Sequence, residues 1–349
     1  MSSRWVILFV LFFARTTMAF QFQSVAALAP LVIDGYGASL ADIGLLIGFY
    51  FAPGIVIAIP GGAIAKRFGD RRVVGAGMVL MVVGALLPVL DSSWETLVAG
   101  RVLAGIGGVI LSVLTTKMLT DWFAGREIAT AMAIYVNSWP VGIALALLIL
   151  PAAAGAGGLD LAWIAVLSLI AMGLVLFVTG YRAPDHETAP PAVATRTGGL
   201  PLAPVLFAGT IWALYNTALA MVFGFGPTLL TQRGWSLAAA SSTTSIVMWL
   251  IAVVVPIGGY LADRSGRRDT VIATGLVGFA VMLVAAIYVP MWAVPGVFIV
   301  LGLIAGLPAG PIMSLPSLVL RAETRALGMG VFFTIYYVAF MVAPAIAGW

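Results

Sequence analysis

The chain is a succession of long apolar stretches separated by short polar segments. A helix that crosses the hydrocarbon core of a bilayer needs about 20 mostly apolar residues, and eleven stretches of roughly this length can be drawn. Each stretch predicts one membrane-spanning helix. The predicted helices cover residues 5–33, 43–65, 73–90, 96–116, 128–150, 162–181, 201–230, 240–262, 270–288, 293–320 and 327–349.

The composition supports the same class of protein. Of the 349 residues, 62% are hydrophobic and 9% are charged, whereas roughly a quarter of the residues of a soluble domain are charged. We therefore predict an all-α membrane protein. The sequence has no Cys, and its single His, His186, lies in a polar stretch. Thiolate chemistry, Cys- or His-based metal sites and a catalytic triad are thus excluded, and we expect no enzyme activity, metal or cofactor.

The positions of the basic residues predict an orientation. If the N-terminus is cytoplasmic, 14 of the 17 Lys and Arg residues fall in cytoplasmic segments and only Arg233 falls in an outer loop, while Arg15 and Arg101 lie within helices. This distribution follows the positive-inside rule. The net charge of +4 therefore reflects topology. We expect a monomer in the lipid bilayer of the cell (inner or plasma) membrane, with no nucleic-acid partner.

The sequence contains an internal repeat. Residues 61–69 (GGAIAKRFG) match residues 258–266 (GGYLADRSG) at an offset of 197, which is 258 minus 61. The same offset places Pro30 on Pro227, each near the end of a predicted helix. Self-similarity at a fixed offset indicates two related halves.

The repeat predicts the domain organisation. Residues 1–181 form a six-helix bundle, residues 182–200 form a cytoplasmic linker rich in Pro, Ala and Thr, and residues 201–349 form a second bundle of five helices. The sixth helix, moved by 197 residues, falls beyond residue 349, so we expect eleven helices with the twelfth missing. Transporters built from such repeats bind their solute near the middle of the membrane between the halves.

Two motifs resemble signatures of the major facilitator superfamily. Residues 259–268 (GYLADRSGRR) are similar to the loop signature of that family, and residues 62–72 are a degraded copy with Lys66 where Asp is expected. Residues 101–107 (RVLAGIG) resemble a second signature, in the fourth helix. The resemblance implies the major facilitator fold and transport by alternating access. It implies gating or conformational roles for Gly62, Arg67, Gly69, Arg71, Arg101, Gly105, Gly259, Asp263, Arg264, Gly266 and Arg267.

The degraded loop leaves two interpretations open. Asp70 can partly replace the carboxylate that Lys66 lacks, or the charges of both loops only set the topology. A narrower resemblance links residues 14–24 (ARTTMAFQFQS) and 121–127 (DWFAGRE) to the cyanate-permease and nitrate/nitrite-porter side of the superfamily. The Gly-Pro pair typical of drug/proton antiporters is represented only by residues 139–142 (WPVG), which lack the Gly before Pro.

Arg15 is the leading candidate for solute binding. Every Asp and Glu falls in a loop or at the end of a predicted helix, whereas Arg15 lies well inside the first one, roughly 15 Å deep at 1.5 Å per residue. A cation at that depth costs at least about 2.5 kcal/mol and needs a partner. A guanidinium suits carboxylate, nitrate or similar anions. We predict that Arg15 binds a small anionic solute; the alternative is that it binds backbone carbonyls of a broken helix.

Polar and aromatic residues on other predicted helices complete the candidate site. The offset of 197 places Trp212 on Arg15, so a cation in one half faces an aromatic in the other. Each of these residues could instead serve packing. Uniport, exchange and symport remain open, as do efflux of amphipathic drugs and a non-transporting membrane sensor. The candidate solute contacts besides Arg15 are Gln23, Tyr50, Asn137, Trp212, Tyr215, Asn216, Trp249 and Tyr336.

Overall fold

A computed structural model describes residues 3–123, 131, 134–183, 201–320 and 325–349. Helices and short connections account for all of these residues, and no strand occurs among them. Nine helices of this described part are long and apolar enough to cross a membrane. The prediction of an all-α protein of many membrane-spanning helices is confirmed.

The structure divides into two compact units, Met1–Ala192 with Met341–Trp349, and Val193–Phe340, here called the first and second units. The helices of the first unit are α1 (Ser3–Ala27), α2 (Ala29–Tyr36), α3 (Leu40–Phe68), α4 (Asp70–Leu90), α5 (Trp94–Phe123) and α7 (Ser138–Gly180). The second unit contains α8 (Leu202–Gln232), α9 (Leu237–Ser265), α10 (Arg268–Tyr288), a 3-10 turn (Met291–Ala293), α11 (Val294–Gly306), α12 (Ala309–Val319) and most of α13 (Arg325–Gly348).

Two predicted boundaries differ from the observed ones because glycine and proline interrupt the helices. The fifth and sixth predicted helices run together as α7, but the backbone breaks at Gly157 and Gly158. Gly158 has φ 72°, a left-handed conformation that glycine adopts without steric cost. The tenth predicted helix is divided into α11 and α12 next to Pro308, whose ring cannot continue the hydrogen-bond ladder.

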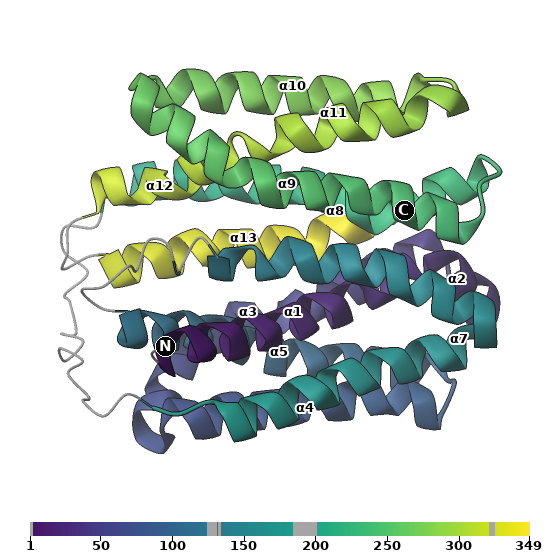
Figure 1. Cartoon of the computed structure of the whole chain (residues 1–349), viewed down its shortest axis with the longest axis horizontal. Coiled ribbons are helices and arrows are strands. Elements are labelled where there is room, and N and C mark those ends of the chain that lie inside the picture. The colour runs from purple at the N-terminus through teal and green to yellow at the C-terminus, as the bar shows by residue number, and fades with distance from the viewer. Residues whose placement is uncertain (1–2, 124–130, 132–133, 184–200, 321–324) are drawn as a thin grey trace. The chain divides into compact units, whose positions relative to one another are not determined.

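The packing within each unit is set by apolar faces. In the first unit, α1 packs against α7, and α5 packs against both α3 and α4. In the second unit, α11 packs against α9 and α10, and α8 packs against α9 and α12; Figure 1 shows α10 and α11 side by side. The predicted division into two bundles stays a prediction, and residues 184–200 of the predicted linker lie outside the described residues.

The internal repeat is visible in the helix crossings. A Cβ added to Gly105 of α5 would lie 2.3 Å from the carbonyl oxygen of Tyr50 in α3. A Cβ added to Gly302 of α11 would lie 3.0 Å from the Cα of Val247 in α9. Both residues of the second pair follow those of the first by 197 (302 minus 105, and 247 minus 50). The same close helix approach, possible only without a side chain, therefore recurs in both units.

Candidate functional site

Arg15 lies at the centre of α1, as the thirteenth of its 25 residues, and its side chain is partly exposed. Its Nη1 donates a hydrogen bond to the carbonyl oxygen of Tyr135 at 3.4 Å. Its guanidinium carbon is 4.8 Å from the centre of the Tyr135 ring. The buried Nε has no hydrogen-bond partner. No carboxylate of the residues that the structure describes forms an ion pair with Arg15.

Tyr135 is held firmly beneath this guanidinium. The residue is 1% exposed, and its hydroxyl forms a hydrogen bond with the hydroxyl of Thr115 in α5. Its carbonyl oxygen also accepts a hydrogen bond from the Ser138 hydroxyl at 2.6 Å. The longer contact from Arg15 exceeds the usual 2.7–3.2 Å range for such bonds. Arg15 therefore keeps most of its donor capacity, while the tyrosine beside it is fixed.

Sequence reasoning missed Tyr135 and Thr115. Tyr135 is the single Tyr of the predicted helix 128–150, and a search for an aromatic partner for the deep Arg15 could have found it. The alternative was that Arg15 binds backbone carbonyls. In the structure it makes one such hydrogen bond, which is long and therefore weak. The prediction that Arg15 binds solute stays a prediction.

The other candidates of the first unit lie apart from this contact or at its edge. Gln23 is fully buried in α1. The Tyr50 hydroxyl donates to the carbonyl oxygen of Met18 at 3.3 Å, and its ring lies 4.7 Å from the guanidinium of Arg101. Asn137 is partly exposed at the start of α7, two residues after Tyr135. Of these, Asn137 is the candidate that the chain places near Tyr135.

Arg101 is used entirely for helix packing. It is 4% exposed, and all three of its nitrogens donate to backbone carbonyls. The acceptors are Leu46 of α3 at 3.1 Å and Gln21 and Phe22 of α1 at 2.8 and 2.9 Å. A guanidinium with its donors in a fixed fork can join three helices in this way. This geometry supports a structural role for Arg101 over contact with solute.

The second unit gathers three of the predicted aromatics. The Trp212 ring lies 5.8 Å from that of Tyr215 and 6.4 Å from that of Tyr336. The Tyr215 hydroxyl donates to the carbonyl oxygen of Ala305 at 2.7 Å, and the Asn216 amide donates to the carbonyl oxygen of Trp212 at 2.8 Å. The buried Nε1 of Trp212 has no hydrogen-bond partner. Trp249, on α9, is 38% exposed.

The loop motifs lie at the helix ends. Gly69, with φ 84°, precedes α4, and Gly266, with φ 64°, ends α9; both have positive φ, which glycine adopts without steric cost. Arg71 donates to the carbonyl oxygen of Val178 at 2.7 Å, and Arg264 donates to the Tyr260 hydroxyl at 3.0 Å. Arg67 and Arg267 are exposed, and Gly259 is partly exposed. The surroundings of Gly62 and the side chain of Asp263 lie outside the described part of the structure.

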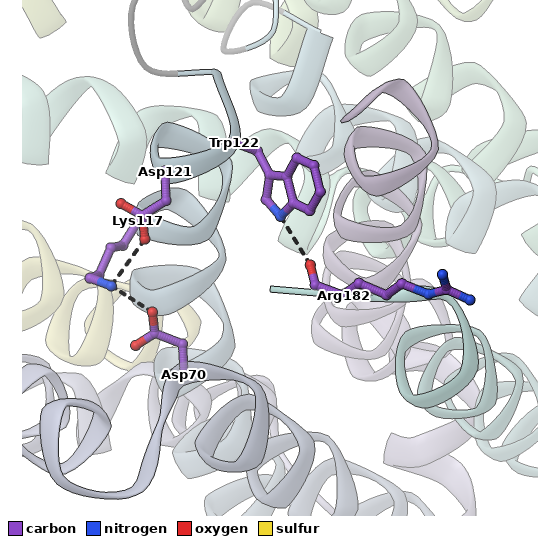
Figure 2. Close-up of polar contacts among 5 residues, drawn as sticks. All are labelled: Asp70, Lys117, Asp121, Trp122 and Arg182. Carbon is purple, nitrogen blue, oxygen red and sulfur yellow. Dashed lines mark hydrogen bonds and ion pairs between the residues drawn. The ribbon is translucent and has the colours of Figure 1, made fainter. Parts of the chain in front are cut away.

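A polar cluster joins the first of these loops to α5 (Figure 2). Lys117 Nζ lies 2.5 Å from Asp70 Oδ2 and 3.1 Å from Asp121 Oδ2. Nearby, the Trp122 indole donates to the carbonyl oxygen of Arg182 at 3.0 Å. Asp70 thus supplies a carboxylate that holds the α3–α4 turn to α5, in the loop where position 66 carries Lys.

Comparison with known proteins identifies the family. The model of the Major Facilitator Superfamily matches residues 8–344. The chain belongs to the Major Facilitator Superfamily. It is therefore a transporter of the membrane, built from many transmembrane helices, that carries a small solute. The predicted resemblance of the chain to the superfamily is confirmed.

Relatives within the superfamily include transporters of anions. The chain is 24% identical to "Probable anion transporter 6" of Oryza sativa over 75% of this chain and 68% of that protein. It is 24% identical to the hexuronate transporter of Bacillus subtilis over 80% and 71%. It is 26% identical to the 3-(3-hydroxy-phenyl)propionate transporter of Escherichia coli over 92% and 81%. None of these three is a cyanate or nitrate porter, so that narrower resemblance stays a prediction.

Solved structures of the superfamily share the fold. A bacterial homologue of the human lysosomal transporter Spinster, in its inward-facing and occupied conformation, superimposes with a TM-score of 0.85 at 18% identity, covering 100% of this chain and 82% of that one. A D-xylose-proton symporter gives 0.82 at 15% identity, covering 99% and 90%. The predicted major facilitator fold is confirmed.

Proposed function

We propose that this protein is a secondary active or facilitative transporter of a small organic anion that works by alternating access, and that Arg15 binds the anionic group. The observation that carries the proposal is the state of the Arg15 guanidinium. It lies midway along α1, makes one long hydrogen bond and has no described carboxylate partner.

The chemistry of the guanidinium favours a carboxylate. Arginine has five N–H donors arranged in a planar fork, and two parallel donors match the two oxygens of a carboxylate. A cation held in an apolar layer needs compensation, and the Tyr135 ring at 4.8 Å provides part of it through a cation–π contact. An anionic solute would supply the rest. Binding would therefore be strongest for solutes with a negative charge, and weak for neutral ones.

The names of relatives support the same class of solute. A hexuronate and a 3-(3-hydroxyphenyl)propionate both carry a carboxylate on a small organic body, and the rice protein is named a probable anion transporter. Another relative, 24% identical, is named a 2-nitroimidazole transporter. A panel of test solutes should therefore contain a neutral nitro compound beside the anions.

Uptake into proteoliposomes tests the proposal. The panel contains a hexuronate, a phenylpropionate, nitrate, cyanate and 2-nitroimidazole, and the proteins are the wild type, Arg15→Lys and Arg15→Gln. We expect uptake of at least one carboxylate, reduced about tenfold or more by Arg15→Gln because a charge-assisted hydrogen-bond pair is lost. Arg15→Lys keeps the charge without the fork and should lie between.

A matched control separates the effect of losing Arg15 from the effect of lowering the net charge by one. Arg233→Gln removes one positive charge from the turn after α8, where Arg233 binds the carbonyl oxygens of Ala286 and Val289. It should transport as the wild type does. Undiminished carboxylate uptake by a folded Arg15→Gln protein would remove Arg15 from the mechanism, and uptake of 2-nitroimidazole alone would refute an anionic solute.

The coupling mode is part of the proposal. Since every Asp and Glu falls in a predicted loop or at the end of a predicted helix, we favour uniport or exchange, or symport of a proton that the solute itself carries. Uptake driven by preloaded unlabelled anion indicates exchange. Uptake that follows an imposed pH gradient indicates proton symport.

We further propose that the protein lies in the cell membrane with a cytoplasmic N-terminus. The sequence has no Cys, so single cysteines report cleanly on the side of the membrane. Ser92 is exposed after α4, and Ser265 is exposed at the end of α9. In intact cells, an impermeant maleimide should label Ser92→Cys but should label Ser265→Cys only after permeabilisation. The reverse pattern would invert the orientation.

A further inference from the structure

Trp139 of α7 follows Tyr135, the aromatic partner of Arg15, by four residues. Four residues make about one helical turn, a rise of roughly 6 Å, so the two aromatic residues lie on the same side of this span. The Trp139 ring lies 5.2 Å from that of Phe22 in α1 and 5.9 Å from that of Phe51 in α3. The two phenylalanine rings lie 4.9 Å from each other. Contacts with two other helices therefore hold the indole in place.

Part of the indole is left uncovered by this cluster. Phe22 and Phe51 are 1% and 5% exposed, whereas Trp139 is partly exposed. Leu148, which is 39% exposed, follows Trp139 by nine residues, and nine residues place it about half a turn round the helix. The indole is therefore on the side of α7 that is turned toward α1 and α3, away from the exposed Leu148.

The repeat indicates that Trp139 and Arg15 are neighbours. The offset of 197 places Trp212 on Arg15 (212 minus 15) and Tyr336 on Trp139 (336 minus 139). In the second unit, the rings of Trp212 and Tyr336 lie 6.4 Å apart. Equivalent positions of the repeat are thus adjacent where they can be measured between two rings. In the first unit the same two positions carry a cation and an aromatic ring.

The helices that carry this pair are in direct contact. A Cβ added to Gly142 of α7 would lie 2.4 Å from the carbonyl oxygen of Thr16 and 2.6 Å from the Cβ of Ala19, both in α1. Such an approach is possible only without a side chain, so the register of the two helices is fixed. The spacing between the Arg15 guanidinium and the Trp139 indole is therefore built into the fold.

We infer that Trp139 is an aromatic subsite beside Arg15, and that the solute is a carboxylate whose aromatic ring is joined to it by a short alkyl chain. This inference rests on the proposed binding of the anionic group by Arg15 and adds the class of the organic body. Aromatic rings pack on one another with centres about 4.5–7 Å apart. With the carboxylate on Arg15, the chain must span roughly one helical turn to bring the ring onto the indole.

Four solutes that differ in one feature at a time test the inference. The reference is 3-phenylpropionate, and 3-cyclohexylpropionate keeps the carboxylate and the chain but has no π system. Benzoate lacks the chain, and 3-phenylpropionamide lacks the charge. The proteins are the wild type, Trp139→Leu, Trp139→Phe and Arg15→Gln. The matched control is Trp292→Leu, which removes an indole that is 84% exposed outside the proposed site. Uptake into proteoliposomes gives kcat/KM, and calorimetric titration of the purified protein gives the Kd.

We expect the wild type to prefer 3-phenylpropionate to 3-cyclohexylpropionate by about fivefold, the size of one aromatic pair. Trp139→Leu should bring this ratio close to one by lowering the value for the phenyl compound, whereas Trp139→Phe should keep most of it. Trp292→Leu should leave the ratio unchanged. Benzoate should be the poorest carboxylate, because its ring cannot reach Trp139 while its carboxylate is on Arg15. A purely structural role of Trp139 would lower both solutes together and leave the ratio as it is.

The outcomes separate this inference from the proposed function. A folded Trp139→Leu protein with the wild-type ratio, or a wild type that takes benzoate as well as 3-phenylpropionate, overturns the subsite. The anion proposal still stands in that case if Arg15→Gln loses the carboxylates. Equal use of 3-phenylpropionamide and 3-phenylpropionate overturns the anion proposal instead. A folded wild type that neither binds nor carries any of the four compounds overturns the inference about the solute.

Discussion

Arg15 lies over the ring of Tyr135 in the first unit as Trp212 lies over the ring of Phe332 in the second, at 4.8 and 6.3 Å. Both members of the second pair follow the first by 197 residues (212 minus 15, and 332 minus 135). Equivalent positions of the repeat are therefore in contact in both units. In the first unit the contact joins a cation to an aromatic ring, and in the second it joins two aromatic rings. The repeat has become chemically asymmetric at the position that we propose binds solute.

The Tyr135 ring and its hydroxyl should affect transport differently. Tyr135→Leu removes the cation–π contact that holds the Arg15 guanidinium in place for the anion. Because the anion must then order the side chain itself, at a cost of about 1 kcal/mol, the apparent KM should rise roughly fivefold. Tyr135→Phe keeps the ring and loses only the bond to Thr115, and its KM should stay close to that of the wild type. Radiolabelled uptake in proteoliposomes over a range of solute concentrations measures both. Equal KM values for the Leu and Phe variants would contradict a role for the ring.

Substitution of Arg101 by lysine should destabilise the protein although the positive charge is kept. Arg101→Lys keeps a buried cation, but one ammonium cannot reach the three carbonyl oxygens that the guanidinium binds on α1 and α3. The protein should lose about 2 kcal/mol of stability, because a buried charge is left incompletely bonded. Arg101→Met removes the charge together with its bonds and should be less harmful. Thermal unfolding in detergent ranks the two, and a lysine variant as stable as the wild type would contradict this assignment.

The helical type and the approximate course of the membrane spans could be predicted because a bilayer demands long apolar runs. Residues 43–65 and 270–288 correspond to α3 and α10 within a few residues. The interruptions were harder to place. The predicted helix 5–33 divides after Ala27, just before the sequence Ala29-Pro30, since a proline in the first turn favours a new helix start. Hydrophobicity alone does not carry that information.

The candidate site could be predicted only in part. Arg15 stands out from its sequence alone because charge is rare within an apolar run. Its partner Tyr135 depends on how two helices cross, which no local pattern encodes. The acceptors of Arg101 are backbone carbonyls. Because every residue has a backbone carbonyl, these partners cannot be predicted from a side-chain motif. The exposure of a side chain is also not predictable from its residue type. Trp249 was a candidate because it is aromatic, but the structure leaves it 38% exposed.

The repeated glycine crossings give a prediction on stability. Gly105→Ala would place a methyl group 2.3 Å from the backbone oxygen of Tyr50, which cannot move without shifting α3. The cost should be about 2 kcal/mol. The matched variant Gly75→Ala lies inside α4 with nothing within 4 Å of the added carbon, and should be neutral or gain about 0.5 kcal/mol from helix propensity. Unfolding by denaturant in detergent compares the two. Equal stability of both variants would contradict the close approach of α3 and α5.

The polar cluster at the end of α5 should contribute modestly and depend on salt. The Lys117 side chain is 45% exposed and that of Asp70 is 20% exposed, so solvent screens their attraction. A double-mutant cycle of Asp70→Asn and Lys117→Met should give a coupling below about 1 kcal/mol. The coupling of Lys117 with Asp121 should be smaller still, because that distance is 3.1 Å rather than 2.5 Å and Asp121 is 33% exposed.

The dependence on ionic strength distinguishes this ion pair from a steric packing contact. Raising the salt concentration to 1 M shortens the Debye length to about 3 Å, so the coupling between Asp70 and Lys117 should fall toward zero. The cost of Gly105→Ala arises from steric overlap and should not change. Thermal unfolding of the four proteins of the cycle at low and high salt measures the difference. A coupling that persists unchanged at 1 M salt would mean that Asp70 and Lys117 act through packing, and would remove the electrostatic link between the α3–α4 turn and α5.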